Sequence, residues 1–223
     1  MQTKRKNPYI ISVVFPSTRT HWDFDNIFKY IDFASINTNG YYSSYRHDTP
    51  QLTGATSPLY SEKAKLTERN VDSFVKHYSC STKQPNKLNI LSEFVGRYWE
   101  NVIRPENPAD TLWMTAEPIN GSIRAGWWPW RDLAKNGWNV SAAAWNDDSK
   151  TPYIWRPEER KYLAFENVRS LREKTKYVIE KNIGGLAVWR IDHDDDENTM
   201  LKTLTSADRC FEKDDTDVKY NCN

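Results

Sequence analysis

Four short stretches along the chain have the apolar, β-branched character of buried strands. The clearest is YIISVVF at residues 9–15, a continuous apolar run that ends at a Pro-Ser-Thr turn. Such a run is typical of a strand that is buried on both faces of a parallel sheet. The other predicted strands are residues 31–36, 87–95 and 186–191.

Between these strands the apolar positions change to helical spacing. A period of i, i+3, i+4 and i+7 is shared by Val71, Phe74, Val75 and Tyr78, which predicts an amphipathic helix. Asn70 is its expected N-cap. Strands that alternate with helices favour βα crossovers and a parallel sheet.

The last helix–strand unit gives a similar signal. Ser170 and Glu173 have the spacing of a capping box, and a common helical face follows at Leu171, Thr175 and Val178. Residues 24–31 are expected to form a short helix or turn, residues 199–210 a closing helix, and residues 192–197 an acidic loop.

Residues 102–163 break the alternation and predict a small α+β insertion. This stretch holds seven of the ten tryptophans, including Trp127, Trp128 and Trp130. Exposed aromatic clusters mark binding surfaces, so these three rings could form a platform for a glycan. A small insertion also needs a core of its own, and burial there is the competing interpretation.

Composition excludes some classes of partner. The 223 residues carry a net charge of +1, which provides no general field for nucleic acid or a membrane surface. No apolar run approaches the ~20 residues of a spanning helix, and no signal peptide is recognisable. The mean hydropathy is −0.81, yet 13% of residues are aromatic, which argues against disorder.

The cysteines and histidines do not indicate a metal or cofactor site. Cys80, Cys210 and Cys222 contain no CxxC pair, and the four histidines lack ligand spacing. Cys210 and Cys222 could form one bridge that leaves Cys80 free, or all three could be reduced. We therefore expect no metal and no cofactor.

Several motifs together resemble one family. Their order along the chain is IDFASI at 31–36, TGATSPLY at 53–60, KL with FVGRYW at 87–99, YLAFE at 162–166 and GGLAVW-ID at 184–192. These stretches resemble the last strands of family 18 chitinases, whose usual texts are DFINVMTYD, TGxxSPLY, KLVLGIPxYGRxW and GGxMxWxxDxDD. Phrases such as KQPNKLN at 83–89 are most similar to nematode chitinase-like proteins.

This resemblance implies an α/β fold, namely strands five to eight of a (β/α)8 TIM barrel with a small α+β insertion before the last unit. A complete barrel takes ~250 residues, more than this chain offers outside its insertion. The expected divisions are 1–101 for strands five to seven, 102–163 for the insertion, 164–210 for the last unit and closing helix, and 211–223 for a polar tail.

The resemblance also implies which chemistry is absent. Family 18 hydrolysis uses a Glu in the signature DGxDxDWE, and no stretch of these residues matches it. The family's Tyr-Asp pair on strand six corresponds to Asn39 and Gly40, and its Pro and Tyr on strand seven correspond to Glu93 and Val95. General acid–base help is worth ~10²–10⁴-fold, so its loss should leave little turnover.

Four residues are candidates for sugar binding, and none for catalysis. By resemblance Trp189 lies at the barrel floor, where a sugar ring could stack on it, although a core role is equally open. Tyr41, Asn39 and Arg97 are the other candidates; for Tyr41 and Arg97 an ordinary loop aromatic and an ion-paired surface residue are the competing interpretations.

The expected function is that of a non-catalytic chitinase-like protein that binds chitin or N-acetylglucosamine oligosaccharides. The alternatives are the C-terminal part of an active chitinase and a protein-interaction module. We expect no nucleic acid or membrane partner, self-association through open barrel edges, and, by resemblance to the family, an extracellular location.

Overall fold

The computed structural model describes residues 9–61, 67–105, 111–206 and 217–222. A parallel four-stranded sheet forms one part of the fold, in the order β1-β2-β3-β9. Its strands are β1 (Ser12–Phe15), β2 (Phe33–Ile36), β3 (Leu88–Glu93) and β9 (Gly185–Trp189). All four predicted strands are therefore present, each shorter than predicted.

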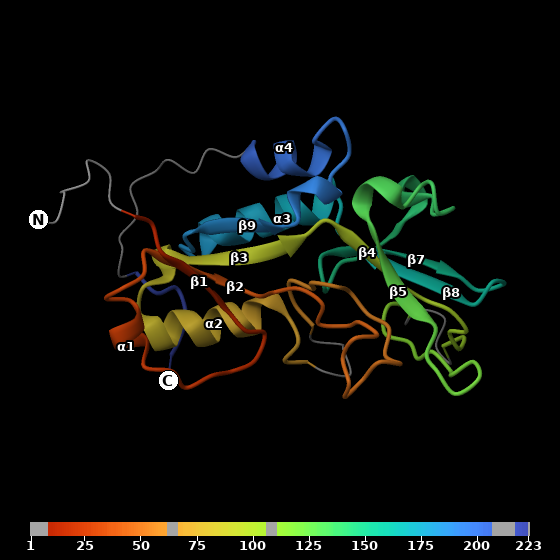
Figure 1. Ribbon diagram of the computed structural model, residues 1–223, viewed down its shortest axis with the longest axis horizontal. Helices are drawn as coiled ribbons and strands as arrows, with labels where there is room; N and C mark the ends of the chain where they lie inside the picture. Colours follow the sequence, from red (N-terminus) through yellow and green to blue (C-terminus); the bar gives the residue numbers. More distant parts are fainter. Residues whose placement is uncertain (1–8, 62–66, 106–110, 207–216, 223) are drawn as a thin grey trace, which may run out of the picture.

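A second sheet is antiparallel and has five strands in the order β5-β4-β8-β7-β6. Its strands are β4 (Val95–Trp99), β5 (Ala125–Pro129), β6 (Ala144–Asn146), β7 (Thr151–Arg156) and β8 (Lys161–Phe165). Figure 1 shows this sheet beyond the arrowheads of β3 and β9. The chain is thus an α/β protein with two kinds of sheet, as predicted, and the antiparallel sheet extends past residues 102–163 at both ends.

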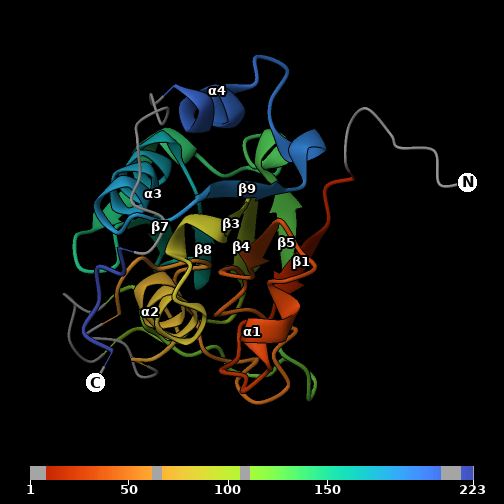
Figure 2. The ribbon, with the colours of Figure 1, turned by 90° about the vertical axis from the view of Figure 1, so that its left-hand side faces the viewer.

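The α-helices are α1 (Phe24–Ile27), α2 (Val71–Thr82), α3 (Val168–Glu180) and α4 (Thr199–Thr205). Short 3-10 turns complete the described elements: η1 (Pro85–Lys87), η2 (Trp130–Asp132), η3 (Val140–Ala142) and η4 (Ile191–His193). In Figure 2, β9 and β3 lie near α3 and α4, whereas β1 lies near α1. The segment 24–31, predicted as a short helix or turn, contains the single helical turn α1, and α4 ends at Thr205 within the described residues.

Helix α2 forms as its sequence predicts. The side chain of Asn70 caps it by accepting a hydrogen bond of 2.7 Å from the backbone N–H of Ser73. The predicted face is buried, with Val71, Val75 and Tyr78 inaccessible to solvent. These side chains belong to the main core, together with inward-facing residues of β1, β2 and β3.

Helix α3 begins earlier than predicted. Asn167, not Ser170, is its N-cap, and the two residues cap each other: Asn167 accepts from the N–H of Ser170, and Ser170 Oγ accepts from the N–H of Asn167. The prediction that paired Ser170 with Glu173 is therefore wrong, because an Asn–Ser pair three residues upstream makes the same reciprocal contacts.

The first apolar run is less buried than predicted. Only residues 12–15 pair as β1, an outer strand of its sheet, and Val14 is 56% exposed. Tyr9, Ile10 and Ile11 precede the strand and are exposed as well. The expectation of burial on both faces is wrong here, because Ser12 and Val14 point to an exposed face, whereas Phe15 on the other face is buried.

The disulfide joins Cys80 in α2 to Cys222, with 5.4 Å between their Cα atoms. The predictions of a Cys210–Cys222 bridge and of three reduced cysteines are both wrong. Residues 217–222 return beneath α2 (Figure 1), and Tyr220 Oη donates to Asp72 Oδ1 at 3.0 Å. The spacing of the cysteines along the chain could not reveal that Cys222 lies next to Cys80, since 142 residues separate them. Cys210 lies outside the described residues.

Candidate functional site

A cavity of about 260 Å³ opens at the carboxyl ends of β3 and β9, where the two sheets meet. It is lined by Tyr45, Glu93, Val95, Arg97, Trp127, Trp189, Arg190 and His193. We call it the Trp189 pocket. In open α/β sheets, ligands bind outside the carboxyl ends of the strands, so its place in the fold is that of a binding site.

Trp189 is the last residue of β9 and lies at the mouth of the pocket. Its side chain is 58% exposed, which separates it from the buried core. The peptide bond that follows it is cis. An indole face that is open to solvent beside a concave surface can stack against a ligand ring.

Arg97 and Glu93 form a partly buried ion pair in the same pocket. Arg97 Nη2 donates to Glu93 Oε2 at 2.5 Å, and the side chains are only 12% and 17% exposed. Gly40 lies against this pair: a Cβ on it would be 3.3 Å from Arg97 Nη2. Gly40 also has a φ of +63°, a conformation that favours glycine. The absence of a side chain at Gly40 thus leaves room for the guanidinium.

Trp127 and His193 form the opposite part of the lining. Their rings are 5.4 Å apart, and Trp127 is 38% exposed. Burial lowers the pKa of His193 below its ordinary value of 6.5, and Arg190 acts in the same direction, whereas Asp192 and Glu93 oppose it. His193 is therefore mainly neutral at pH 7, and its ring is tilted by 31° against the Trp127 indole.

Two arginines fix the acidic loop beside the pocket. Arg190 binds Asp192 through two hydrogen bonds of 3.0 and 2.6 Å, and these bonds lower the pKa of Asp192. Arg131 donates to the carbonyl of Asp192 at 3.3 Å and pairs with Asp196. The loop is thereby tied to the segment that follows β5, which keeps the pocket wall in place.

Two of the predicted site residues lie away from the Trp189 pocket. Tyr41 is completely buried, its ring stacks on Phe74 at 5.5 Å, and burial raises the pKa of its hydroxyl well above the ordinary value. Asn39 is 5% exposed, and neither amide atom has a hydrogen-bond partner among the described residues. Trp189 and Arg97 do line the pocket, so the structure brings two of the four candidates together.

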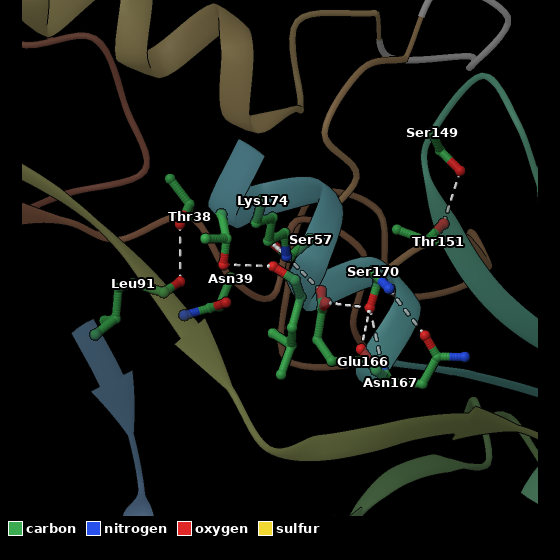
Figure 3. A network of polar contacts seen from close by, with 12 residues as sticks. Thr38, Asn39, Ser57, Leu91, Ser149, Thr151, Glu166, Asn167, Ser170 and Lys174 are labelled. Atoms are coloured by element: carbon green, nitrogen blue, oxygen red, sulfur yellow. Dashed lines mark hydrogen bonds and ion pairs between the residues drawn. The ribbon is translucent and has the colours of Figure 1, made fainter. Parts of the chain in front are cut away.

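A buried polar network surrounds the first turns of helix α3 (Figure 3). Glu166 and Lys174 form an ion pair with side chains 1% and 2% exposed. Lys174 Nζ also donates to Ser57 Oγ at 2.7 Å, and Ser170 Oγ donates to Glu166 Oε2 at 2.7 Å. Ser57 and Glu166 belong to the TGATSPLY and YLAFE motifs, which the network joins through Ser170 and Lys174 of α3. Neither motif lines the pocket.

Other kinds of site find no support in the described part of the chain. Within residues 9–61, 67–105, 111–206 and 217–222, no three His, Cys, Asp or Glu side chains cluster as metal ligands would. No helix of these segments is long and apolar enough to cross a membrane.

Sequence reasoning missed part of the pocket lining. Tyr45, Arg190 and His193 come from segments without a regular pattern, and no local signal identifies them. Trp127 belongs to the tryptophan cluster that the sequence marks as a possible glycan platform. Its place in this pocket has a further signal: it lies directly opposite Arg97 in the ladder between β4 and β5, and opposite residues share a face. That signal requires the strand register, which the sequence alone does not provide.

Known proteins give a consistent comparison. A family model described as "Glycosyl hydrolases family 18" matches residues 1–194. Chitotriosidase-1 of Mus musculus is 25% identical over 206 residues, which cover 87% of this chain and 41% of that protein. A probable endochitinase of the nematode Caenorhabditis elegans is 22% identical over 181 residues, or 78% of this chain and 28% of that protein.

A solved structure of class V chitinase from Nicotiana tobaccum in complex with NAG4 superimposes with a TM-score of 0.74. It is 13% identical and covers 88% of this chain and 56% of that one, so the likeness concerns the fold alone. The chain spans less than half the length of the two curated relatives. Because the family model matches most of its residues, the chain belongs to glycosyl hydrolases family 18.

Proposed function

We propose that this chain binds N-acetylglucosamine oligosaccharides in the Trp189 pocket and does not hydrolyse them by itself. The observation that carries the proposal is the exposed Trp189 ring at the carboxyl end of β9. Sugar C–H groups carry partial positive charge and stack on the negative face of an aromatic ring. The tobacco relative in complex with NAG4 supports this choice of ligand.

The polar lining suits a neutral sugar. Glu93 and Arg97 compensate each other, as do Asp192 and Arg190, so the pocket offers hydrogen-bonding groups without a large uncompensated charge. Neutral His193 can exchange hydrogen bonds with hydroxyl or acetamido groups. An N-acetylated oligosaccharide matches this combination better than a strongly anionic glycan.

We infer the absence of hydrolysis from the lack of a carboxylic acid that is free to act as the general acid. The DGxDxDWE signature does not occur in these 223 residues. Glu93 is the one carboxylate in the pocket lining, and Arg97 already engages it. The position that resembles the family's strand-six Asp is Gly40, and the Arg97 guanidinium lies against it. These features supply no free acid to protonate a leaving group.

We further propose that the parallel sheet corresponds to strands five to eight of a (β/α)8 barrel, and that residues 102–163 are the insertion, whose strands pair with the preceding strand β4 in the antiparallel sheet. The order β1-β2-β3-β9, the motifs on β2, β3 and β9, and the partial coverage of the relatives support this correspondence. The proposed divisions remain 1–101, 102–163, 164–210 and 211–223.

The open edges support self-association. Val14 of β1 is 56% exposed, Ile10 just before it is 75% exposed, and β1 and β9 are the outer strands of their sheet. Unpaired apolar edges favour pairing with another chain. Sedimentation should show oligomers, and a monodisperse monomer at high concentration would contradict this part of the proposal.

An extracellular location is also proposed. The Cys80–Cys222 disulfide supports it, because such bonds persist mainly in oxidising compartments. Secretion of the protein in its native cells, followed by detection of the bridge under non-reducing conditions, would test it.

The binding test is calorimetry with the tetramer of N-acetylglucosamine. Trp189→Ala should weaken binding at least ~10-fold, because a tryptophan that acts as a binding hot spot is worth about 2 kcal/mol or more and tenfold corresponds to about 1.4 kcal/mol. Trp22→Ala is the matched control, because Trp22 is a 43% exposed indole outside the pocket lining. Equal affinities for the two variants would refute the site, provided that both give the same cooperative melt.

One observation favours a second function. The chain spans 41% of chitotriosidase-1, as expected for the C-terminal part of an active chitinase. In that case a longer product of the same gene, with the acid-bearing motif, would hydrolyse the tetramer and lose turnover in Trp189→Ala. Hydrolysis by the present chain alone would exclude the non-catalytic proposal.

A further inference from the structure

A second cavity lies on the other face of the antiparallel sheet. It has a volume of about 170 Å³ and is lined by Tyr98, Glu100, Trp128, Asn136, Trp138, Arg156 and Lys161. None of these residues lines the Trp189 pocket. We call it the outer pocket.

The strand register explains why the two pockets face opposite ways. In the β4–β5 ladder Arg97 lies opposite Trp127, whereas Tyr98 lies opposite Gly126. Successive side chains of a strand point to opposite faces, so Trp127 and Arg97 face the Trp189 pocket, while Trp128 and Tyr98 face the outer pocket. The Trp-Trp pair thus contributes one ring to each cavity.

The outer pocket contains a preformed aromatic platform. The rings of Tyr98 and Trp128 are nearly parallel, at 15°, with centroids 6.1 Å apart, and both are partly exposed. A Cβ at Gly126 would lie 2.9 Å from the Tyr98 hydroxyl and 3.0 Å from Cε1 of its ring. The missing side chain at Gly126 therefore lets the Tyr98 ring lie flat across β5.

Polar groups of both signs surround the platform. Glu100 makes no side-chain ion pair with another described residue, while Lys161 pairs with Glu159 at 3.3 Å. Arg156 lies 4.5 Å from the Trp138 ring centre and donates to the Gly137 carbonyl. Two cations disfavour a positively charged ligand, and Glu100 disfavours an anion. Donors and acceptors beside aromatic faces suit a neutral ring that carries hydroxyl groups.

We propose that the outer pocket is a second sugar-binding site, which takes one neutral hexopyranose ring at the end of a glycan. The ring stacks on Tyr98 and Trp128, and its hydroxyls bond to Glu100 and Lys161. At about 170 Å³ the cavity is smaller than the Trp189 pocket of about 260 Å³, so we assign it one ring at the end of a glycan. This site is independent of the Trp189 pocket, and a chain with both could bridge two glycan strands.

The test measures the binding of monomeric N-acetylglucosamine, glucose and mannose to the Trp189→Ala variant by saturation-transfer NMR. Trp189→Ala disables the proposed binding in the Trp189 pocket, so a failure of that proposal can be distinguished from a failure of the outer-pocket proposal. At least one monosaccharide should still bind. Glu100→Ala and Trp128→Phe should each weaken that binding at least ~10-fold, whereas Trp22→Ala should leave it unchanged.

Gly126→Ala provides a check that removes no ligand contact. The added methyl group must displace the Tyr98 ring, so binding should weaken although every polar group is retained. Near-ultraviolet circular dichroism and thermal melts verify that each variant is folded. The proposal is overturned if no monosaccharide binds, or if binding persists unchanged in Glu100→Ala and Trp128→Phe.

Discussion

Loss of the Cys80–Cys222 disulfide should cost a large part of the stability of the chain. The bond closes a loop of 142 residues, which corresponds to about 5 kcal/mol in the chain-entropy treatment of the unfolded state. A bridge between Cys210 and Cys222, twelve residues apart, would be worth only about 3 kcal/mol by the same relation. The size of the effect therefore discriminates between the two pairings.

The hydrogen bonds that residues 217–222 make in the folded protein should change the stability lost on reduction only slightly. Tyr220 remains hydrogen-bonded to Asp72, and Asn182 still donates to the Asp217 carbonyl at 3.0 Å after reduction. These contacts stabilise the folded state in oxidised and reduced chains alike, whereas the bridge restricts the unfolded chain. Each kcal/mol shifts the melting temperature of a protein this size by ~2–4 °C, so we expect a decrease of roughly 10–20 °C.

The assay compares thermal melts of the wild type, with and without reductant, with those of Cys80→Ser and Cys222→Ser. Cys210→Ser is the matched control and should melt as the wild type does. Peptide mapping under non-reducing conditions identifies the linked pair directly. A Cys80 thiol that alkylates freely in the native protein, or a Cys80→Ser variant with an unchanged melt, would refute the reasoning.

Three further predictions concern the core and the pocket. Glu166→Ala should destabilise the fold by roughly 3–5 kcal/mol in urea titrations, because it leaves the Lys174 ammonium buried and unpaired. The double variant Glu166→Leu/Lys174→Met should recover most of this loss. A Glu166→Ala variant within about 1 kcal/mol of the wild type would contradict the prediction. Burial holds the pKa of His193 below 6.5 in the folded state, so the unfolded state binds more protons. Relative to His193→Gln, the stability of the wild type should therefore rise with pH up to about 6.5 and then level off. Parallel stability profiles of the two proteins would exclude a pH effect of His193. Gly184→Ala places a Cβ 2.2 Å from the Asn86 carbonyl oxygen, so the unfolding free energy should fall by about 1–3 kcal/mol. An unchanged urea midpoint would contradict this and show that the backbone shifts to accommodate the methyl group.

Local signals were sufficient for helix α2. Its cap and its buried face are both encoded within twelve neighbouring positions, and the structure reproduces them. Helix α3 shows the limit of such signals, because Asn167–Ser170 and Ser170–Glu173 are both plausible caps in sequence. The helix begins at the earlier pair, where Glu166 can also accept from Ser170.

Strand positions were predictable, but strand ends were not. Residues 87–95 were predicted as one strand, yet β3 stops at Glu93 and the chain enters the other sheet at Val95. Phe94 lies between the two strands and is fully buried in a small cluster with Leu171 and Met200. The break depends on distant partners such as Trp130, whose N–H donates to the Phe94 carbonyl, and Leu171, and no short window of sequence contains them.

The candidate site was predictable where a motif fixed a residue at a strand end, as for Trp189. It was not predictable where burial decided the outcome. Tyr41 follows β2 in the loop expected to reach the pocket, but its ring stacks on Phe74 of α2 instead. Tyr45, four positions later, lines the pocket and is 64% exposed. Sequence alone gives both residues the same aromatic loop character.

The tryptophans of the insertion show why core and binding surface were false alternatives. Trp128 packs against the small cluster around Leu133 and Leu163, and it also lines the outer pocket. Trp127, its neighbour, lines the Trp189 pocket on the opposite face. Because side chains alternate along a strand, a shift of β5 by one residue would exchange the two rings between the cavities. The register of β5 against β4, held by the close fit of Tyr98 over Gly126, therefore determines both proposed sites at once.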